Sequence, residues 1–219
     1  MLSNLCLQQK GYQSLENIYT NSEVNIILQH IEKELEPDQQ TFAMRAFLQQ
    51  YPTLLPLIFN KKLKQIIAQI APKAQIIRSI YFDKPPAANW IVNWHQDLTI
   101  NVNQKLALEG FKNWRILKNR TVVQPSLEVL ENIFTIRIHL DDCTAKNGAL
   151  RVVPNSHKAG IIPVAAGISD WIKNEETVEL KKGGIFLMKP LLLHASRRTE
   201  NNLNRRVIHI ELSLSLIHI

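Results

Sequence analysis

Apolar and polar positions follow two different rhythms along this 219-residue chain. Over residues 24–35 and again over residues 60–70, apolar side chains recur three or four positions apart. That spacing places them on one face of a helix, so we predict a helix in each segment. Asn21 or Ser22 is suited to cap the first helix, and a proline follows each segment.

From residue 74 onward the pattern favours short strands. Runs rich in Ile, Val, Leu and Phe are separated by turn residues, with Asn147 and Gly148 predicting a hairpin and Gly183 and Gly184 another turn. The expected strands are 75–82, 90–99, 134–140, 149–153, 177–180, 184–188, 191–194 and 206–212. A helical start followed by roughly eight short strands predicts a mainly β protein with N-terminal helices, a cupin-like jelly roll or double-stranded β-helix.

The chain shows no internal repeat or linker, so we expect residues 1–213 to form a single domain. Its helical N-terminal portion spans 1–73 and its jelly roll 74–213, with 101–132 as a lid-like insertion that carries no convincing strand pattern. Residues 214–219 match what one reading frame of a transposon-library sequencing adapter encodes, and we expect a non-native tail. The alternative is a real apolar terminal strand.

Composition says more about the partners and the cellular compartment of the protein than about its reaction. The net charge of +7 is spread along the chain without a basic stripe or a nucleic-acid-binding module, so no nucleic-acid partner is expected, although an anionic substrate stays possible. Cys6 and Cys143 are too far apart to suggest a disulfide framework, which favours the cytoplasm. No apolar run is long enough to cross a bilayer, so no membrane partner is expected. The oligomeric state is open.

The strongest chemical signal is a His-x-Asp pair. In an extended strand His95 and Asp97 point to one face and Gln96 to the other. Together with His194, which follows an apolar run, they have the composition of a two-His, one-carboxylate set that binds Fe(II) and leaves coordination positions open. Taken singly, the pair could lie at a surface strand end and His194 could be a core histidine.

Further candidates flank this set. Arg205 begins the last expected strand and could bind a carboxylate through its guanidinium fork, and Ser196 could donate to the same anion. The alternative for Arg205 is a surface cation. Arg137 alternates with His139 and Asp141, a polar face that suits a strand lining a cavity.

Three ordered blocks make the chain resemble the phytanoyl-CoA dioxygenase family of Fe(II)- and 2-oxoglutarate-dependent oxygenases. They are residues 76–97, which end in the Trp-His-Gln-Asp motif, residues 140–158, which contain Asn-Gly-Ala-Leu-Arg, and residues 194–206. Asn155 stands where that family usually has glycine, and Asn tolerates the left-handed turn that this position requires.

The resemblance implies a set of roles. His95, Asp97 and His194 would ligate Fe(II), and 2-oxoglutarate and O2 would serve as co-substrates, with succinate and CO2 released. Arg205 and Ser196 would hold the distal carboxylate of 2-oxoglutarate. The carboxylate at Asp97 implies a hydroxylase, because related halogenases have a small residue there.

Two more residues are weaker candidates for this pocket. Arg137 stands where the family commonly has an aromatic or amide side chain, and it could contact the co-substrate or an anionic substrate. Lys84 lies in the first block, and its alternative is to stabilise a turn. We interpret His157 and His209 as structural.

The resulting hypothesis is a 2-oxoglutarate-dependent dioxygenase that hydroxylates a small organic molecule. A non-catalytic jelly-roll binding protein with a structural or vestigial metal site is the main alternative. A nucleic-acid demethylase would need a positively charged groove, and the scattered Lys and Arg residues do not indicate one.

Overall fold

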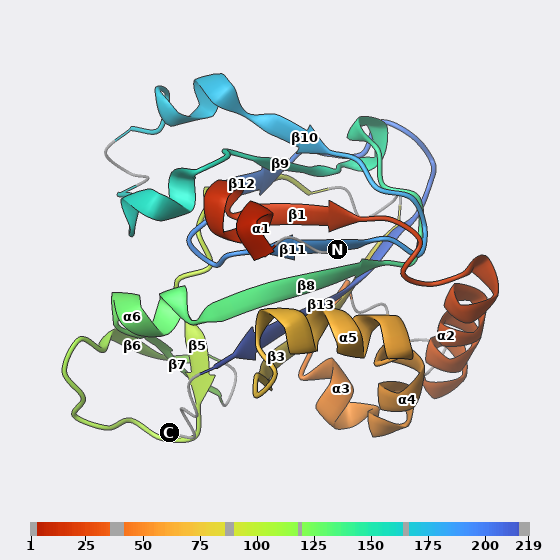
Figure 1. The fold of residues 1–219 in the computed structure, drawn as a ribbon, viewed down its shortest axis with the longest axis horizontal. Coiled ribbons are helices and arrows are strands. Elements are labelled where there is room, and N and C mark those ends of the chain that lie inside the picture. The colour runs from red at the N-terminus through yellow and green to blue at the C-terminus, as the bar shows by residue number, and fades with distance from the viewer. Residues whose placement is uncertain (1–3, 36–41, 86–89, 118–119, 164–166, 215–219) are drawn as a thin grey trace.

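The chain folds into two facing antiparallel sheets, with helices on the outer side of the larger one and a small third sheet at one end (Figure 1). The computed structural model describes residues 4–35, 42–85, 90–117, 120–163 and 167–214. Within them, no helix is both long and apolar enough to cross a membrane. The mainly β jelly roll with N-terminal helices that the sequence predicts is confirmed.

The larger sheet has six antiparallel strands and provides one wall of the interior. In spatial order they are β1 (Tyr12–Leu15), β11 (Ile185–Met188), β8 (Ile133–His139), β13 (Arg205–Ser213), β3 (Gln75–Lys84) and β2 (Ala43–Arg45). The central strand β13 pairs with both β8 and β3. Its alternate residues therefore face the helices on one side and the second sheet on the other.

The smaller sheet provides the opposite wall. Its strands, again antiparallel, are β10 (Glu176–Val178), β9 (Leu150–Val152), β12 (His194–Ser196) and β4 (Val92–His95). β4 is shorter than the strand that we predict over 90–99, and β12 shares only His194 with the strand that we predict over 191–194. Residues beyond them turn away from the sheet, and the N–H of Asp97 donates to the carbonyl of Pro190.

The expectation that residues 101–132 lack strands is wrong. They contribute to β5 (Ile100–Val102), β6 (Lys112–Leu117) and β7 (Arg120–Gln124), which form the third sheet, and to α6 (Leu127–Glu131). β6 is an exposed edge strand whose register shifts between Lys112 and Arg115. Because neither face of β6 is buried along its length, its sequence lacks the alternation that marks a strand.

Helices cover the outer face of the larger sheet. They are α2 (Asn21–Glu34), α3 (Phe47–Gln50), α4 (Leu55–Ile58) and α5 (Lys61–Ile70), while α1 (Asn4–Lys10) precedes β1. Thr20, one residue before the predicted caps, is the N-cap of α2, where it forms a capping box with Glu23. Asn60 caps α5 by accepting from the N–H of Leu63.

Two different environments lie on the two faces of the larger sheet. The outer face joins the helices in an apolar core that includes Phe47, Tyr81 and Ile208. The inner face is apolar at the β1 and β11 side, where Phe186 and Met188 pack against the smaller sheet. Under β8, β13 and β3 the inner face carries polar and charged side chains beside a few apolar ones such as Val207, and that part of the interior adjoins the candidate site.

Two turn predictions have different outcomes. Gly183 has a φ of 83°, and the N–H of Gly184 donates to Lys181, so the predicted turn is confirmed. Asn147 and Gly148 do not close a hairpin. Asn147 ends a short 3-10 helix, and Gly148 follows with a φ of 80°. This segment connects β8 to β9, which belong to different sheets.

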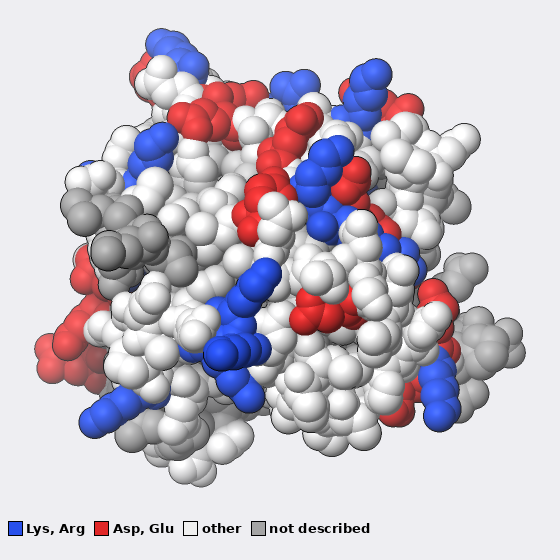
Figure 2. Space-filling model, turned by 45° about the vertical axis from the view of Figure 1, so that its right-hand side comes forward, with Lys and Arg blue, Asp and Glu red and all other residues white. Residues whose placement is uncertain are grey.

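Charged residues of both signs are interspersed on the face drawn in Figure 2, and no continuous basic stripe crosses its described part. β13 ends at Ser213, and the N–H of Leu214 donates to Asn132. Residues 215–219, most of the expected non-native tail, lie outside the described residues. The extent of the domain stays a prediction.

Candidate metal centre

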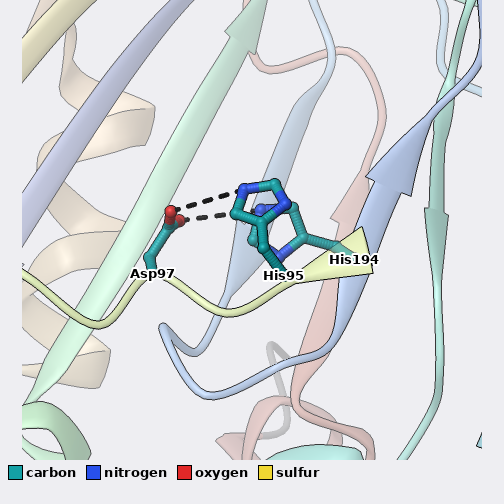
Figure 3. A group of neighbouring side chains, drawn as sticks. All are labelled: His95, Asp97 and His194. Carbon is teal, nitrogen blue, oxygen red and sulfur yellow. Dashed lines mark ion pairs between the residues drawn. The ribbon is translucent and has the colours of Figure 1, made fainter. Parts of the chain in front are cut away.

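The smaller sheet brings the two predicted histidines together. His95 is the last residue of β4 and His194 the first of β12, and the antiparallel register pairs them directly. Their ring centroids are 4.2 Å apart. Asp97 lies two residues past the end of β4 and turns its carboxylate toward both rings (Figure 3). A residue pair near position 95 and a histidine about a hundred residues later therefore share one site.

The three side chains present their ligand atoms to a common point. Nε2 of His95 lies 3.8 Å from Oδ1 of Asp97, and Nε2 of His194 lies 3.7 Å from Oδ2. All three can offer atoms that lie within 4.8 Å of one another. The side chain of His194 is 5% exposed and that of His95 is 39% exposed. The site is thus closed at His194 and open at His95.

Backbone hydrogen bonds select the same tautomer in both histidines. Nδ1 of His95 is 2.8 Å from the carbonyl of Asn93, and Nδ1 of His194 is 2.9 Å from the carbonyl of Leu192. A carbonyl only accepts, so in the neutral form of each ring Nδ1 carries the proton and Nε2 keeps its lone pair. Both lone pairs are on the side of Asp97, as metal ligation requires.

Electrostatics favour an ionised Asp97 and a neutral His194. Burial alone would raise the pKa of Asp97, but His194 and His209 outweigh it and lower that pKa. Burial lowers the pKa of His194. Oδ2 of Asp97 is buried and has no hydrogen-bond partner among the described residues. An ionised carboxylate oxygen left without a donor fits a site that binds a cation.

Gln96 points away from the site, as predicted, and is buried. Its side-chain N–H groups donate to the carbonyls of Gly160 and Leu191, and its Oε1 accepts from the N–H of Ile162. These three bonds tie the residue between the two β4-side ligands to the loops around the site. The sequence showed its direction but not these partners.

The inward-facing residues of β13 and their partners on β8 form four successive levels along β13. From one end these are Arg205, then His139 opposite Val207, then the pair formed by Arg137 and His209, and finally Glu211. Successive levels are two residues apart, roughly 7 Å along a strand. The last two levels adjoin the metal centre, because Asp97, His209 and Glu211 also offer ligand atoms within 4.8 Å of one another.

Arg137 and Arg205 are buried without a carboxylate. Each is 8% exposed, and the Nε of each lacks a hydrogen-bond partner among the described residues. Burial lowers the pKa of both, that of Arg137 to about 10. The arginines with ion pairs in the described residues are instead Arg78, Arg151, Arg197 and Arg206. A buried guanidinium without an anion is costly, so this interior is suited to an anionic ligand.

Ser196 and Lys84 lie at the edges of this region. Ser196 is 3% exposed and, two residues after His194 on β12, shares its face. Lys84 is opposite Arg205, but its Nζ donates to the carbonyls of Trp90 and Arg197. These two acceptors favour the structural alternative for Lys84. Its co-substrate contact stays a prediction, as does that of Ser196.

Three residues that the sequence did not assign to the site belong to this interior. His209 approaches Arg137 through Nδ1 at 3.1 Å and Glu211 through Nε2 at 3.2 Å, and Arg78 donates to Glu211 at 2.9 Å. Polar residues at alternate positions of an otherwise apolar terminal strand were the available signal.

One predicted member of the polar face lies elsewhere. β8 ends at His139, and Asp141 pairs with Arg206 instead of continuing the inward-facing series. His157 is outside the site as well, with Nε2 3.0 Å from the carbonyl of Gln8. Asn155 has a φ of 66°, so the left-handed turn expected there is present.

The family model named Phytanoyl-CoA dioxygenase (PhyH) matches residues 7–207. The chain belongs to this family. The match spans the helical portion as well as the three sequence blocks, and it confirms the class of Fe(II)- and 2-oxoglutarate-dependent oxygenases to which the sequence pointed. No curated protein sequence matches the chain.

Solved structures of similar fold agree with the family. SnoK, titled a non-heme alpha ketoglutarate dependent carbocyclase from nogalamycin biosynthesis, has a TM-score of 0.72 at 15% identity, covering 96% of this chain and 83% of its own. EctD from S. alaskensis, crystallised with 2-oxoglutarate and 5-hydroxyectoine, has 0.70 at 17%, covering 96% and 74%. HygX from Streptomyces hygroscopicus, with nickel and 2-oxoglutarate bound, has 0.67 at 12%, covering 96% and 85%. At these identities the likeness concerns the fold.

Proposed function

We propose that this chain is a hydroxylase that uses Fe(II), 2-oxoglutarate and O2 to oxidise a small organic molecule, releasing succinate and CO2. The observation that carries the proposal is the convergence of His95, Asp97 and His194 with both Nε2 lone pairs directed to one point. This is the donor set of non-haem Fe(II) oxygenases, which leaves coordination positions free for co-substrates.

The residues present fit the implied metal. His95 and His194 would contribute Nε2 and Asp97 a carboxylate oxygen, and Oδ2 of Asp97 lacks any other partner in the described chain. Bound iron, with 2-oxoglutarate and O2, supplies the oxidation itself. The carboxylate of Asp97 would occupy the ligand position that halogenases leave for halide, which supports hydroxylation.

The protein would position the co-substrate. Arg205 is assigned the distal carboxylate of 2-oxoglutarate, because its buried guanidinium has no other anion among the described residues. Ser196, on the same face of β12 as His194, would donate to the same group. Arg137, on β8 opposite His209, is near enough to both Arg205 and Asp97 for their charges to affect its pKa, and it would bind either the co-substrate or an anionic substrate.

An anaerobic titration tests the metal and co-substrate assignments together. Adding Fe(II) and then 2-oxoglutarate should produce the charge-transfer absorption of the chelated 2-oxo acid. His95→Ala and Asp97→Ala should abolish it, and a variant that kept the full absorption would refute the ligand assignment. His157→Ala, which removes a histidine outside the site, is the matched control and should leave the absorption unchanged.

Uncoupled turnover distinguishes this proposal from a non-catalytic binding protein. An active oxygenase should convert 2-oxoglutarate to succinate slowly without substrate, and a vestigial metal site should not. Screening a pool of metabolites for compounds that accelerate succinate release would then identify the substrate.

A further inference from the structure

His139 is a buried histidine whose ring has no hydrogen-bond partner among the described residues. It ends β8 opposite Val207 of β13 and is 3% exposed. Neither Nδ1 nor Nε2 is accessible to solvent, and neither meets a donor or acceptor. A neutral imidazole has one N–H to donate and one lone pair to accept, and burying both without partners is unfavourable. The ring of His139 is therefore suited to a hydrogen-bond partner that the described residues do not provide.

The surroundings of His139 define the charge of that partner. It lies at the level between Arg205 and Arg137 on the inner face of the larger sheet. Burial and then these two cations lower the pKa of His139 to about 3, so the ring is neutral near pH 7. The Nε atoms of both arginines also lack partners in the described chain. His139 and the two arginines thus lie at neighbouring levels of one inner face, each with an unpartnered nitrogen, and an anion with several acceptor oxygens would satisfy them.

We propose that His139 donates a ring N–H to the distal carboxylate of 2-oxoglutarate, beside Arg205. This inference rests on the proposed function. The distal rather than the metal-bound carboxylate is assigned because the level of His139 adjoins that of Arg205, whereas the level of Arg137 and His209 adjoins Asp97. His139 would then help the site select a five-carbon dicarboxylic 2-oxo acid over shorter monocarboxylic ones.

The test compares two 2-oxo acids that differ in the distal carboxylate. Fe(II)-loaded protein is titrated anaerobically with 2-oxoglutarate and with 2-oxobutyrate, and dissociation constants are read from the charge-transfer absorption. His139→Ala and His139→Met, which lack a donor, should weaken 2-oxoglutarate by roughly 10- to 100-fold, the worth of a hydrogen bond to a charged group. Binding of 2-oxobutyrate should change little, and His139→Gln, which keeps an N–H, should restore most of the affinity.

His157→Ala is the control. His157 lies outside the site, with Nε2 3.0 Å from the carbonyl of Gln8. This variant should bind 2-oxoglutarate as the wild type does. Thermal denaturation of every variant shows whether it is folded, and His139→Met fills the space if His139→Ala does not fold.

The outcomes separate the two proposals. If the wild-type protein shows no 2-oxoglutarate absorption, the proposed function fails. If the wild type binds and the donor-free variants bind 2-oxoglutarate equally well, the role of His139 is overturned. An equal loss for both 2-oxo acids would also overturn it, because His139 would then act on the metal-bound end or on the shape of the site.

Discussion

Arg206 binds both carboxylate oxygens of Asp141, with Nε 2.9 Å from Oδ2 and one terminal nitrogen 2.8 Å from Oδ1. Its neighbour Arg205 faces the opposite side of β13, toward the interior, and has no ion pair among the described residues. Strand alternation thus gives two adjacent arginines different environments. One has its anion in the fold, and the other lacks one.

Substituting the two arginines should therefore affect different properties of the protein. Arg205→Ala should weaken 2-oxoglutarate binding at least tenfold with Fe(II) binding intact, because the distal carboxylate loses its cation. Arg206→Ala should instead lower the free energy of unfolding by about 2 kcal/mol, since the half-buried Asp141 loses its guanidinium partner and keeps only the backbone N–H of residue 206. Anaerobic titration and urea denaturation of both variants measure the contrast. Loss of co-substrate binding in Arg206→Ala alone would move the assignment by one residue.

Half of the candidate metal centre was predictable because its signal is local. His95 and Asp97 are separated by a spacing that any extended segment converts into a shared direction, even though β4 ends before Asp97. The pairing of His95 with His194 depends on the register between β4 and β12, which spacing alone does not determine. There the ordered family blocks supplied the information.

The parts that the sequence did not reveal depend on tertiary pairing. β1 contains polar residues and is a strand because it pairs with the edge of β11. The third sheet forms around the apolar residues Ile100, Val102 and Val123, which are too few to set a clear period. Likewise, His209 has no partner nearby in sequence other than Glu211, and its approach to Arg137 arises only when β13 pairs with β8.

Arg137 gives a further test of the interior. Arg137→Gln should weaken 2-oxoglutarate binding about tenfold, because the substitution removes a buried cation near both Arg205 and Asp97 that attracts the doubly charged co-substrate. Arg206→Gln is a suitable control, since Arg206 faces the opposite side of β13 and is already paired with Asp141. If Arg137→Gln binds 2-oxoglutarate normally, Arg137 does not contact the co-substrate. An anionic substrate would then be the candidate ligand of Arg137.

The buried histidines predict a pH dependence of stability in the metal-free protein. Burial lowers the pKa of His139 to about 3, and it also lowers that of His194. In the unfolded chain both titrate near about 6.5, so the unfolded state binds more protons as the pH falls below that value. Their contribution to stability is therefore complete above about pH 6.5 and is lost progressively toward pH 3.

Removing one of these histidines should reduce the loss of stability at low pH. Between pH 7 and 5.5 each such histidine costs about 1 kcal/mol of folding free energy. Urea denaturation at both pH values should thus show a drop smaller by about 1 kcal/mol in His139→Gln than in the wild type. An equal drop in the two proteins would mean that His139 is not held neutral in the fold.

Gln96 should contribute to stability and metal affinity together. Gln96→Leu leaves two buried carbonyls, those of Gly160 and Leu191, and the N–H of Ile162 without their partner. We expect the free energy of unfolding to fall by about 2–4 kcal/mol. We also expect weaker Fe(II) binding, because Gln96 lies between His95 and Asp97. Gln104→Leu, at an exposed position, should change stability by less than about 0.5 kcal/mol. If Gln96→Leu proves as stable as Gln104→Leu, these loops are held together by other contacts.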